Sequence, residues 1–301
     1  MSDSAQPDDQ FRRYAALIRD QLVEAGDFSP QSESATAIQV ERGIIFPLAL
    51  QNRSRQFDAI ERLIEVANRD RLNLIAVVDR GGHHRPVYRG LLVYSCLQTF
   101  GLIYETLPRE QFGRWEEGLR AWCDLLEAEL GETEWPIPPV PAERGSNASE
   151  SAWMALALHI AGKIYVRDAW TDLASDIFGR IARSQTDAGA FLHATPSDNP
   201  ETHWYHELVL LHASASYAVQ SEDRTIATAV ARNAQFHLEQ TQPDHATNQP
   251  WALFAFIWNP LTRSFADQML HATSVQIAAD VDGVSLMLLA DALYCLQLFS
   301  K

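Results

Sequence analysis

The chain has 301 residues, of which 47% are hydrophobic and 21% charged, and its formal net charge is −15. This apolar content supports a large core and excludes global disorder. The acidic balance argues against binding to nucleic-acid phosphates or anionic membrane surfaces, and it favours solubility. The three cysteines, Cys96, Cys123 and Cys295, form no C-x-x-C pair. They indicate buried free thiols and neither a disulfide framework nor a zinc site.

The start of the chain has neither a basic region nor an apolar stretch, so we expect no signal peptide. No uncharged apolar run reaches the length of a membrane span. A cytoplasmic protein is therefore expected, with a disordered tail over residues 1–8 and a single domain over residues 9–301. The oligomeric state cannot be inferred from these features.

Helical periodicity dominates the chain. We expect twelve helical segments, near residues 8–26, 37–51, 53–70, 86–105, 108–131, 148–164, 166–183, 202–219, 223–239, 249–258, 261–273 and 283–299. Residues 72–78 are also compatible with a short strand.

These segments alternate in character along the chain. Segments 53–70 and 108–131 are rich in charge and predict helices with one apolar stripe and one solvated face. Nearly uncharged segments, which predict helices buried on most sides, are 86–105, 148–164, 202–219, 249–258 and 283–299. The alternation predicts an all-α (α/α)6 toroid of about twelve helices, an inner ring inside an outer ring. An open α-solenoid is the alternative.

In such a toroid the inner helices run parallel, so their N-terminal ends meet at one mouth. Free backbone N–H groups at that mouth favour anionic and polar ligands. The segments leading into the inner helices carry histidines, aromatic residues and charged residues together. These predict a pocket rim whose substrate-binding candidates are Tyr88, Arg89, Glu150, Trp153, Glu201, Trp204, Gln249, Trp251 and Asp280.

The densest group of such residues is the run 201–207, which reads Glu-Thr-His-Trp-Tyr-His-Glu. On a helix, His203, His206 and Glu207 share a face, and a histidine beside a carboxylate can act as a general base. Tyr205 is the candidate proton donor. Helix capping with aromatic packing explains the same run structurally.

No metal or cofactor is predicted. His206-Glu207 begins like H-E-x-x-H, but the next histidine, His212, is six residues after His206 and turns off the shared face. His212, His159 and Asp291 lie deep in inner segments and are interpreted as hydrogen-bonded core groups.

One turn resembles a motif of known toroids. Residues 185–191, Gln-Thr-Asp-Ala-Gly-Ala-Phe, are similar to the Q-x-x-D-G-G-F/W turn of α/α-toroid proteins. These include terpenoid cyclases with prenyltransferase-like repeats and some polysaccharide lyases. The resemblance implies the fold, with a glycine that allows a left-handed turn and an aromatic residue packed between hairpins.

A second resemblance suggests a chemistry. Asp280-Val-Asp282-Gly283 is similar to the D-x-D-D acid motif of class II terpenoid cyclases. It implies that Asp282 is a general acid, although Gly283 replaces the last aspartate of the motif. An ordinary pair of N-capping residues explains Asp280 and Asp282 equally well.

The other toroid class that the chain resembles is carbohydrate-active, and it contains uronate lyases and (α/α)6 glycoside hydrolases. Arginine, histidine and tyrosine at the mouth suit β-elimination, whereas Glu150, Glu201 and Glu207 with Asp282 suit hydrolysis by paired carboxylates. The leading hypothesis is a carbohydrate-active lyase or hydrolase with an oligosaccharide or small-molecule ligand. A terpenoid-cyclase-like enzyme and a non-catalytic binding or scaffold toroid remain alternatives.

Overall fold

The computed structural model describes residues 12, 15–16, 76–78, 84–86, 89–131, 145–192, 200–240, 249–258, 262–263, 265–269 and 283–299. The tail predicted over residues 1–8 and the helices predicted near 37–51 and 53–70 lie outside the described residues. Within the described part, helices dominate, and the only sheet is a short two-stranded ribbon. The fold is therefore all-α apart from that ribbon.

The helices expected from residue 86 onward are present to within a few residues wherever the chain is described. Their bounds are α4 (Arg89–Ile103), α5 (Arg109–Gly131), α6 (Gly145–Tyr165), α7 (Asp168–Arg183), α8 (Pro200–Ser221), α9 (Arg224–Gln240), α11 (Leu253–Trp258) and α13 (Gly283–Phe299). Short 3-10 turns are η2 (Tyr104–Thr106) and η3 (Pro250–Ala252). The segment predicted near 261–273 is described only at 262–263 and 265–269, where it is mainly helical.

The strand suggested for residues 72–78 is present in part. Strand β1 (Ala76–Val78) pairs antiparallel with β2 (His84–Pro86), with Val77 opposite Arg85. His84 and Arg85 lie between the segments expected to be helical, and the structure places them in this ribbon. Pro86 ends the strand, and helix α4 begins at Arg89 and not near residue 86.

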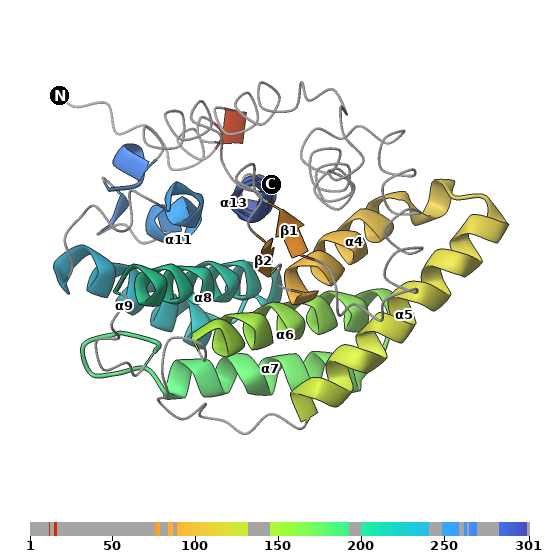
Figure 1. Cartoon of the computed structure of the whole chain (residues 1–301), viewed down its shortest axis with the longest axis horizontal. Coiled ribbons are helices and arrows are strands. Elements are labelled where there is room, and N and C mark those ends of the chain that lie inside the picture. The colour runs from red at the N-terminus through yellow and green to blue at the C-terminus, as the bar shows by residue number, and fades with distance from the viewer. Residues whose placement is uncertain are drawn as a thin grey trace.

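The alternation of helix character is confirmed. Helix α5 buries one stripe, which includes Trp115, Leu119 and Trp122, and leaves Glu117 and Arg120 exposed. Helices α7 and α9 are likewise one-sided. Helix α6, in contrast, is buried almost continuously from residue 148 to residue 161. Figure 1 shows α7 on the opposite side of α6 from α13, so the amphipathic helix is the outer one.

Helices α6 and α8 run in the same direction. Ser149 Oγ donates to the backbone oxygen of His206 at 2.9 Å, and Lys163 Nζ donates to that of Gln220 at 2.6 Å. The two contacts are separated by equal intervals along both helices. Parallel neighbours of this kind are what an inner ring requires.

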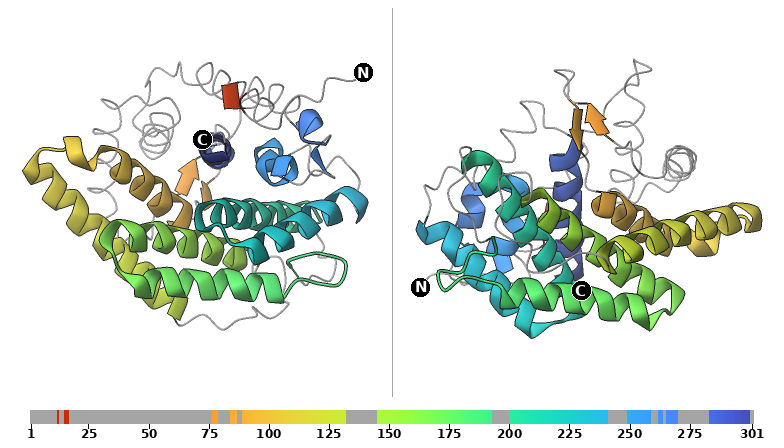
Figure 2. Two further views of the ribbon diagram at one scale, coloured as in Figure 1. Left: turned by 180° about the vertical axis from the view of Figure 1, so that it is seen from behind. Right: turned by 60° about the horizontal axis from the view of Figure 1, so that its bottom comes forward.

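Helices α4 and α13 join the same parallel set. Tyr94 and Gln98 of α4 meet Ser216 and Gln220 of α8 in that order. Helix α13 follows α8 in the same sense, because Asp291 contacts His212 and Cys295 contacts Ser216. The right-hand view of Figure 2 shows α8 and α13 alongside each other. The N-terminal ends of α4, α6, α8 and α13 therefore lie toward one side.

Two helical hairpins use the same turn. Val166, between α6 and α7, has φ of 54°, and Glu222, between α8 and α9, has φ of 56°. Left-handed backbone at the residue after a helix lets the chain reverse sharply. After Glu222, Asp223 Oδ1 accepts the backbone N–H groups of Thr225 and Ile226 and caps α9. The inner-to-outer hairpin is thus a repeated unit, although no residue motif recurs in the sequence.

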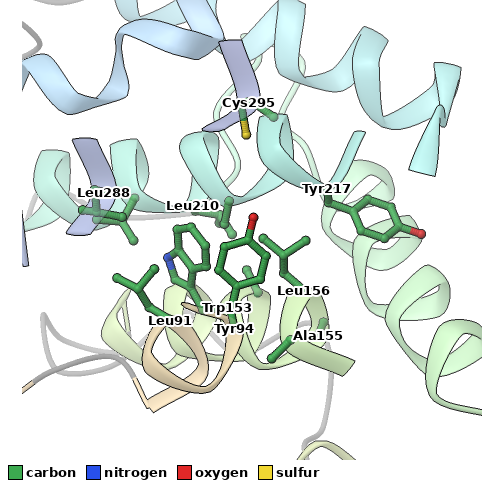
Figure 3. Packing of buried hydrophobic residues seen from close by; sticks show 14 of the residues in the cluster. Leu91, Tyr94, Trp153, Ala155, Leu156, Leu210, Tyr217, Leu288 and Cys295 are labelled. Carbon is green, nitrogen blue, oxygen red and sulfur yellow. The ribbon is translucent and has the colours of Figure 1, made fainter. Parts of the chain in front are cut away.

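One core fills the space between the parallel helices. Figure 3 shows side chains from four helices packed together, and the labelled ones include Leu91, Tyr94, Trp153, Leu210 and Leu288. All five are at most 2% exposed. No helix in the described part of the chain is long and apolar enough to cross a membrane.

Candidate active site

The N-terminal end of α4 touches the middle of α6 backbone to backbone. A Cβ atom on Gly90 would lie 2.2 Å from the backbone nitrogen of Met154 and 2.4 Å from the carbonyl carbon of Trp153. Only glycine permits such an approach. The contact places two of the predicted site residues, Arg89 at the start of α4 and Glu150 in α6, beside each other.

Arg89 bridges two carboxylates. Its Nη2 donates to Glu129 Oε1 at 2.5 Å, and its Nε lies 3.4 Å from Glu150 Oε1. The backbone N–H of Gly90 also donates to Glu150 Oε1, at 3.3 Å. The Glu150 side chain is 17% exposed, whereas that of Glu129, at the C-terminal end of α5, is 48% exposed. Glu150 is therefore the more enclosed carboxylate of the two.

The environment of Glu150 brings its titration close to neutral pH. Burial raises the pKa of the Glu150 carboxyl from an ordinary value near 4.5 to about 7. Arg89 and the Gly90 N–H group lower this pKa, and the negative charge of Glu129 raises it. A carboxyl that keeps its proton near neutrality can act as a general acid.

The predicted residues on α8 lie against η3, the 3-10 turn that leads into α11. The ring of Tyr205 lies 5.5 Å from that of His206 and 5.8 Å from that of Trp251, edge to face in both cases. Trp251 Nε1 donates to Gln249 Oε1 at 2.9 Å, which fixes the indole orientation. Tyr205, His206, Gln249 and Trp251, four of the candidate residues, thus lie together in the structure.

These rings continue inward as an aromatic column. It comprises, in order of contact, His206, Tyr205, Trp251, His212, Trp153 and Tyr94. Beyond Trp251, successive ring centroids lie 6.0, 5.9 and 5.5 Å apart. The half-buried end of the column is at His206 and Tyr205, and from Trp251 onward every ring is at most 2% exposed. The column connects the mouth to the middle of the inner helices.

Glu207 has a different environment from its neighbours. It is fully buried, and its carboxylate accepts hydrogen bonds from the backbone N–H groups of Phe191 and Leu192 at 2.6 and 2.8 Å and from Asn233 Nδ2 at 2.8 Å. All three donors belong to the turn after α7 or to the outer helix α9. Three donors on one buried carboxylate indicate that Glu207 holds the hairpins together.

The turn over residues 185–191 is built as its resemblance implied. Gly189 has φ of 102°, and Phe191 is 4% exposed in the core. Gln185 Nε2 donates to the backbone oxygens of Gly189 and Ala229. Asn233 Nδ2 also donates to Gly189. The motif therefore connects two hairpins and supports the fold.

The remaining predicted residues are placed as follows. Trp204 packs against Phe236 and His237 on α9, on the side of the outer helix. His203 and Glu201 belong to the first turn of α8, but their side chains are outside the described part. Tyr88, Asp280 and Asp282 also lie outside the described residues.

The core contains a polar network larger than the sequence predicted. Asp291 Oδ2 lies 3.1 Å from His212 Nε2, and Tyr94 donates its hydroxyl to Asp291 Oδ1 at 2.6 Å. Gln98 and Gln220 both donate to Tyr94 Oη at 2.7 Å. Burial and the nearby Asp291 carboxylate raise the pKa of Tyr94 well above its ordinary value, so the hydroxyl keeps its proton.

A signal for this network exists in the sequence. Polar residues recur four positions apart in otherwise apolar helices, as Tyr94 and Gln98 on α4 and as His212, Ser216 and Gln220 on α8. Residues four apart share a helix face, so such stripes on parallel helices can face one another. Within the described part of the chain, no cluster of three His, Cys, Asp or Glu side chains could hold a metal ion.

Comparison with known proteins identifies a fold relationship. No model of a protein family and no curated protein matches the chain. Among solved structures, the fold is similar to that of the GH76A α-1,6-mannanase from Salegentibacter sp. HEL1_6, with a TM-score of 0.54. The match covers 97% of this chain and 100% of the mannanase chain at 11% identity. The mannanase has an (α/α)6 toroid, so the similarity supports a toroid-like fold for this chain.

Proposed function

We propose that this protein is a carbohydrate-active hydrolase that cleaves glycosidic bonds at the N-terminal mouth of its inner helices. In this proposal, the helices of the chain form a closed (α/α)6 toroid of six hairpins. The observation that carries it is Glu150, an enclosed carboxyl with a pKa of about 7 at that mouth. The similarity in fold to a glycoside hydrolase supports the same class of reaction.

Glu150 is the general acid in this mechanism. It donates its proton to the glycosidic oxygen as the bond from that oxygen to the anomeric carbon breaks, and water supplies the hydroxyl that replaces the leaving group. A second carboxylate must stabilise the positive charge at the anomeric carbon or activate the water. Because Glu207 is occupied by structural donors, we assign this role to Glu201 or Asp282. Tyr205 and His206, the half-buried rings at this mouth, are suited to contact a sugar face.

Hydrolysis is favoured over uronate β-elimination by the state of Arg89. An uronate lyase must neutralise the substrate carboxylate with a cation. Arg89 is already engaged by Glu129 and Glu150. The net charge of −15 also repels an anionic polysaccharide. Neutral glycans are therefore the proposed substrates.

The test is an assay of the purified protein for release of reducing ends from neutral oligosaccharides, α-1,6-linked mannosides included, beside oligouronides and polyprenyl substrates. Glu150→Gln should lower kcat on a neutral glycan by about 10²- to 10⁴-fold, as expected for loss of a general acid. Glu117→Gln, which removes an exposed carboxylate from α5, is the matched control and should leave turnover unchanged. Full activity of Glu150→Gln would contradict the assignment.

Turnover of a polyprenyl substrate that Asp282→Asn abolishes would favour the cyclase alternative. Ligand binding without turnover would favour the scaffold alternative.

A further inference from the structure

Two adjacent rings of the aromatic column carry unmatched polar atoms. Trp153 and His212 are both 0% exposed, and their ring centroids lie 5.9 Å apart. Among the described residues, none of Trp153 Nε1, His212 Nδ1 and His212 Nε2 has a hydrogen-bond partner, although Nε2 lies 3.1 Å from Asp291 Oδ2. Leaving a buried polar atom unpaired is costly, and folded proteins contain few such atoms. Trp153 Nε1 and His212 Nδ1, which have no such ion-pair contact among the described residues, are called the two unmatched atoms.

Asp291 determines the hydrogen-bonding character of His212. Asp291 Oδ2 lies 3.1 Å from Nε2 without the geometry of a hydrogen bond, and a carboxylate at this distance favours the tautomer that carries its proton on Nε2. Nδ1 is then an acceptor. Asp291 is itself held by the Tyr94 hydroxyl at 2.6 Å. Asp291, which is held by Tyr94, therefore favours one tautomer of His212.

The two unmatched atoms are complementary in type. The indole Nε1 of Trp153 is a donor only, whereas Nδ1 of His212 is an acceptor. A hydroxyl group both donates and accepts, so one hydroxyl, or two neighbouring hydroxyls of one ring, can satisfy both atoms. Figure 3 shows the indole nitrogen of Trp153 directed to the side of Leu91 and Leu288 and away from the Tyr94 hydroxyl, so the buried network does not consume this donor. An anionic ligand would meet the nearby Asp291 carboxylate and is disfavoured.

We propose that Trp153 and His212, with Asp291 as a positioning residue, form a binding position for a hydroxyl group of a neutral saccharide. This position lies at the inner end of the aromatic column, below the half-buried rings of Tyr205 and His206. The chemical class of the ligand rests on the proposed function, whereas the position itself rests on the two unmatched atoms. Trp251 lies between Tyr205 and His212 in the column and separates this position from the half-buried rings.

The first measurement is made on the wild-type protein, and a site variant serves only to assign one signal. The protein has eight tryptophans, so an ¹H–¹⁵N correlation spectrum resolves individual indole N–H groups, and Trp153→Phe identifies the signal of Trp153. Mannose, methyl α-mannoside and α-1,6-mannobiose are titrated into the full chain, with an oligouronide as the anionic comparison. The neutral saccharides should shift the Trp153 indole signal and the oligouronide should not. A bound saccharide that leaves this signal unmoved, or failure of every neutral saccharide to bind, overturns the proposal.

Two substitutions of His212 separate the role of each ring nitrogen. His212→Gln places an amide near the position of Nε2, where it can still meet Asp291, but leaves nothing at the position of Nδ1. It should keep the fold and weaken saccharide affinity by about 10- to 100-fold, as expected for loss of a buried hydrogen bond. His212→Asn keeps a polar group near Nδ1 and loses the contact with Asp291, so it should retain more affinity and less stability. Equal binding by wild type and His212→Gln overturns the proposal.

His159→Gln is the matched control. His159 is a second buried histidine on an inner helix, 6% exposed, and it packs against Tyr217 away from the aromatic column. The substitution His159→Gln should leave saccharide affinity unchanged. Hydrolysis of a glycan without a shift of the Trp153 signal would support the proposed function and overturn this binding position. A shift without hydrolysis would support the position and overturn the hydrolase assignment.

Discussion

Glu207 Oε1 accepts a 2.8 Å hydrogen bond from Asn233 Nδ2, and both side chains are fully buried. The bond joins inner helix α8 to outer helix α9. The same carboxylate also receives the backbone N–H groups of Phe191 and Leu192, which follow the previous outer helix. One side chain therefore connects two successive hairpins. A residue that the sequence presented as a catalytic candidate is positioned to maintain the fold.

Glu207→Gln should destabilise the protein by about 2–4 kcal/mol, because the amide cannot accept all three hydrogen bonds and directs an N–H group at a donor. Urea unfolding measures the change. Activity per folded molecule should stay near that of wild type, whereas the same substitution at Glu150 should remove it. A stable but inactive Glu207→Gln protein would instead show that Glu207 takes part in the reaction.

Gly90→Ala should destabilise the protein by about 3 kcal/mol or more, because the new Cβ meets backbone atoms of α6 that cannot move independently. The displaced α4 entry should also separate Arg89 from Glu150. Gly113→Ala is the matched control, since a Cβ there meets nothing within 4 Å on an exposed part of α5. It should stabilise the helix by roughly 0.5–1 kcal/mol. Thermal unfolding of the pair gives the comparison, and equal effects would contradict the close approach of α4 and α6.

Val166→Gly should stabilise the protein by up to about 1 kcal/mol. Val166 has φ of 54° and is 86% exposed, so glycine relieves left-handed backbone strain and loses little packing. Val166→Ala keeps a Cβ and should recover little of the gain. Chemical denaturation of both variants tests this reasoning. A loss of stability in Val166→Gly would mean that the valine makes a contribution that its exposure does not suggest.

Glu150 should make stability fall as pH rises from about 4.5 to about 7. Its pKa in the folded protein, about 7, lies above its ordinary value, so between these values the folded state binds more protons than the unfolded state. Above pH 7 the carboxylate is buried and charged, at a cost of about 3 kcal/mol at most. Glu150→Gln should remove this dependence, so its stability relative to wild type should be greater at about pH 8 than at about pH 5. Parallel pH profiles for the two proteins would contradict the raised pKa.

The alternation of uncharged and one-sided segments was sufficient to predict an all-α chain, the order of its helices from residue 86 onward and the parallel inner set. This prediction succeeds because apolar residues three and four positions apart form the buried face of a helix. The same local information selected Tyr205, His206, Gln249 and Trp251 as candidates, since each heads a helical segment that was expected at the mouth, but that they meet is seen only in the structure. It could not distinguish Glu207 from Glu150, because both are glutamates near the start of an inner helix.

Only the tertiary structure separates the two glutamates. Glu207 turns toward α9 and three structural donors, and Glu150 turns toward Gly90 and Arg89. It likewise brings Tyr94 to Asp291, 197 residues away along the chain. By itself the sequence determined which faces of the described helices are apolar and, to within a few residues, where those helices begin and end. Which polar side chains share an environment depends on the packing of distant helices, because burial and electrostatics are properties of the assembled fold.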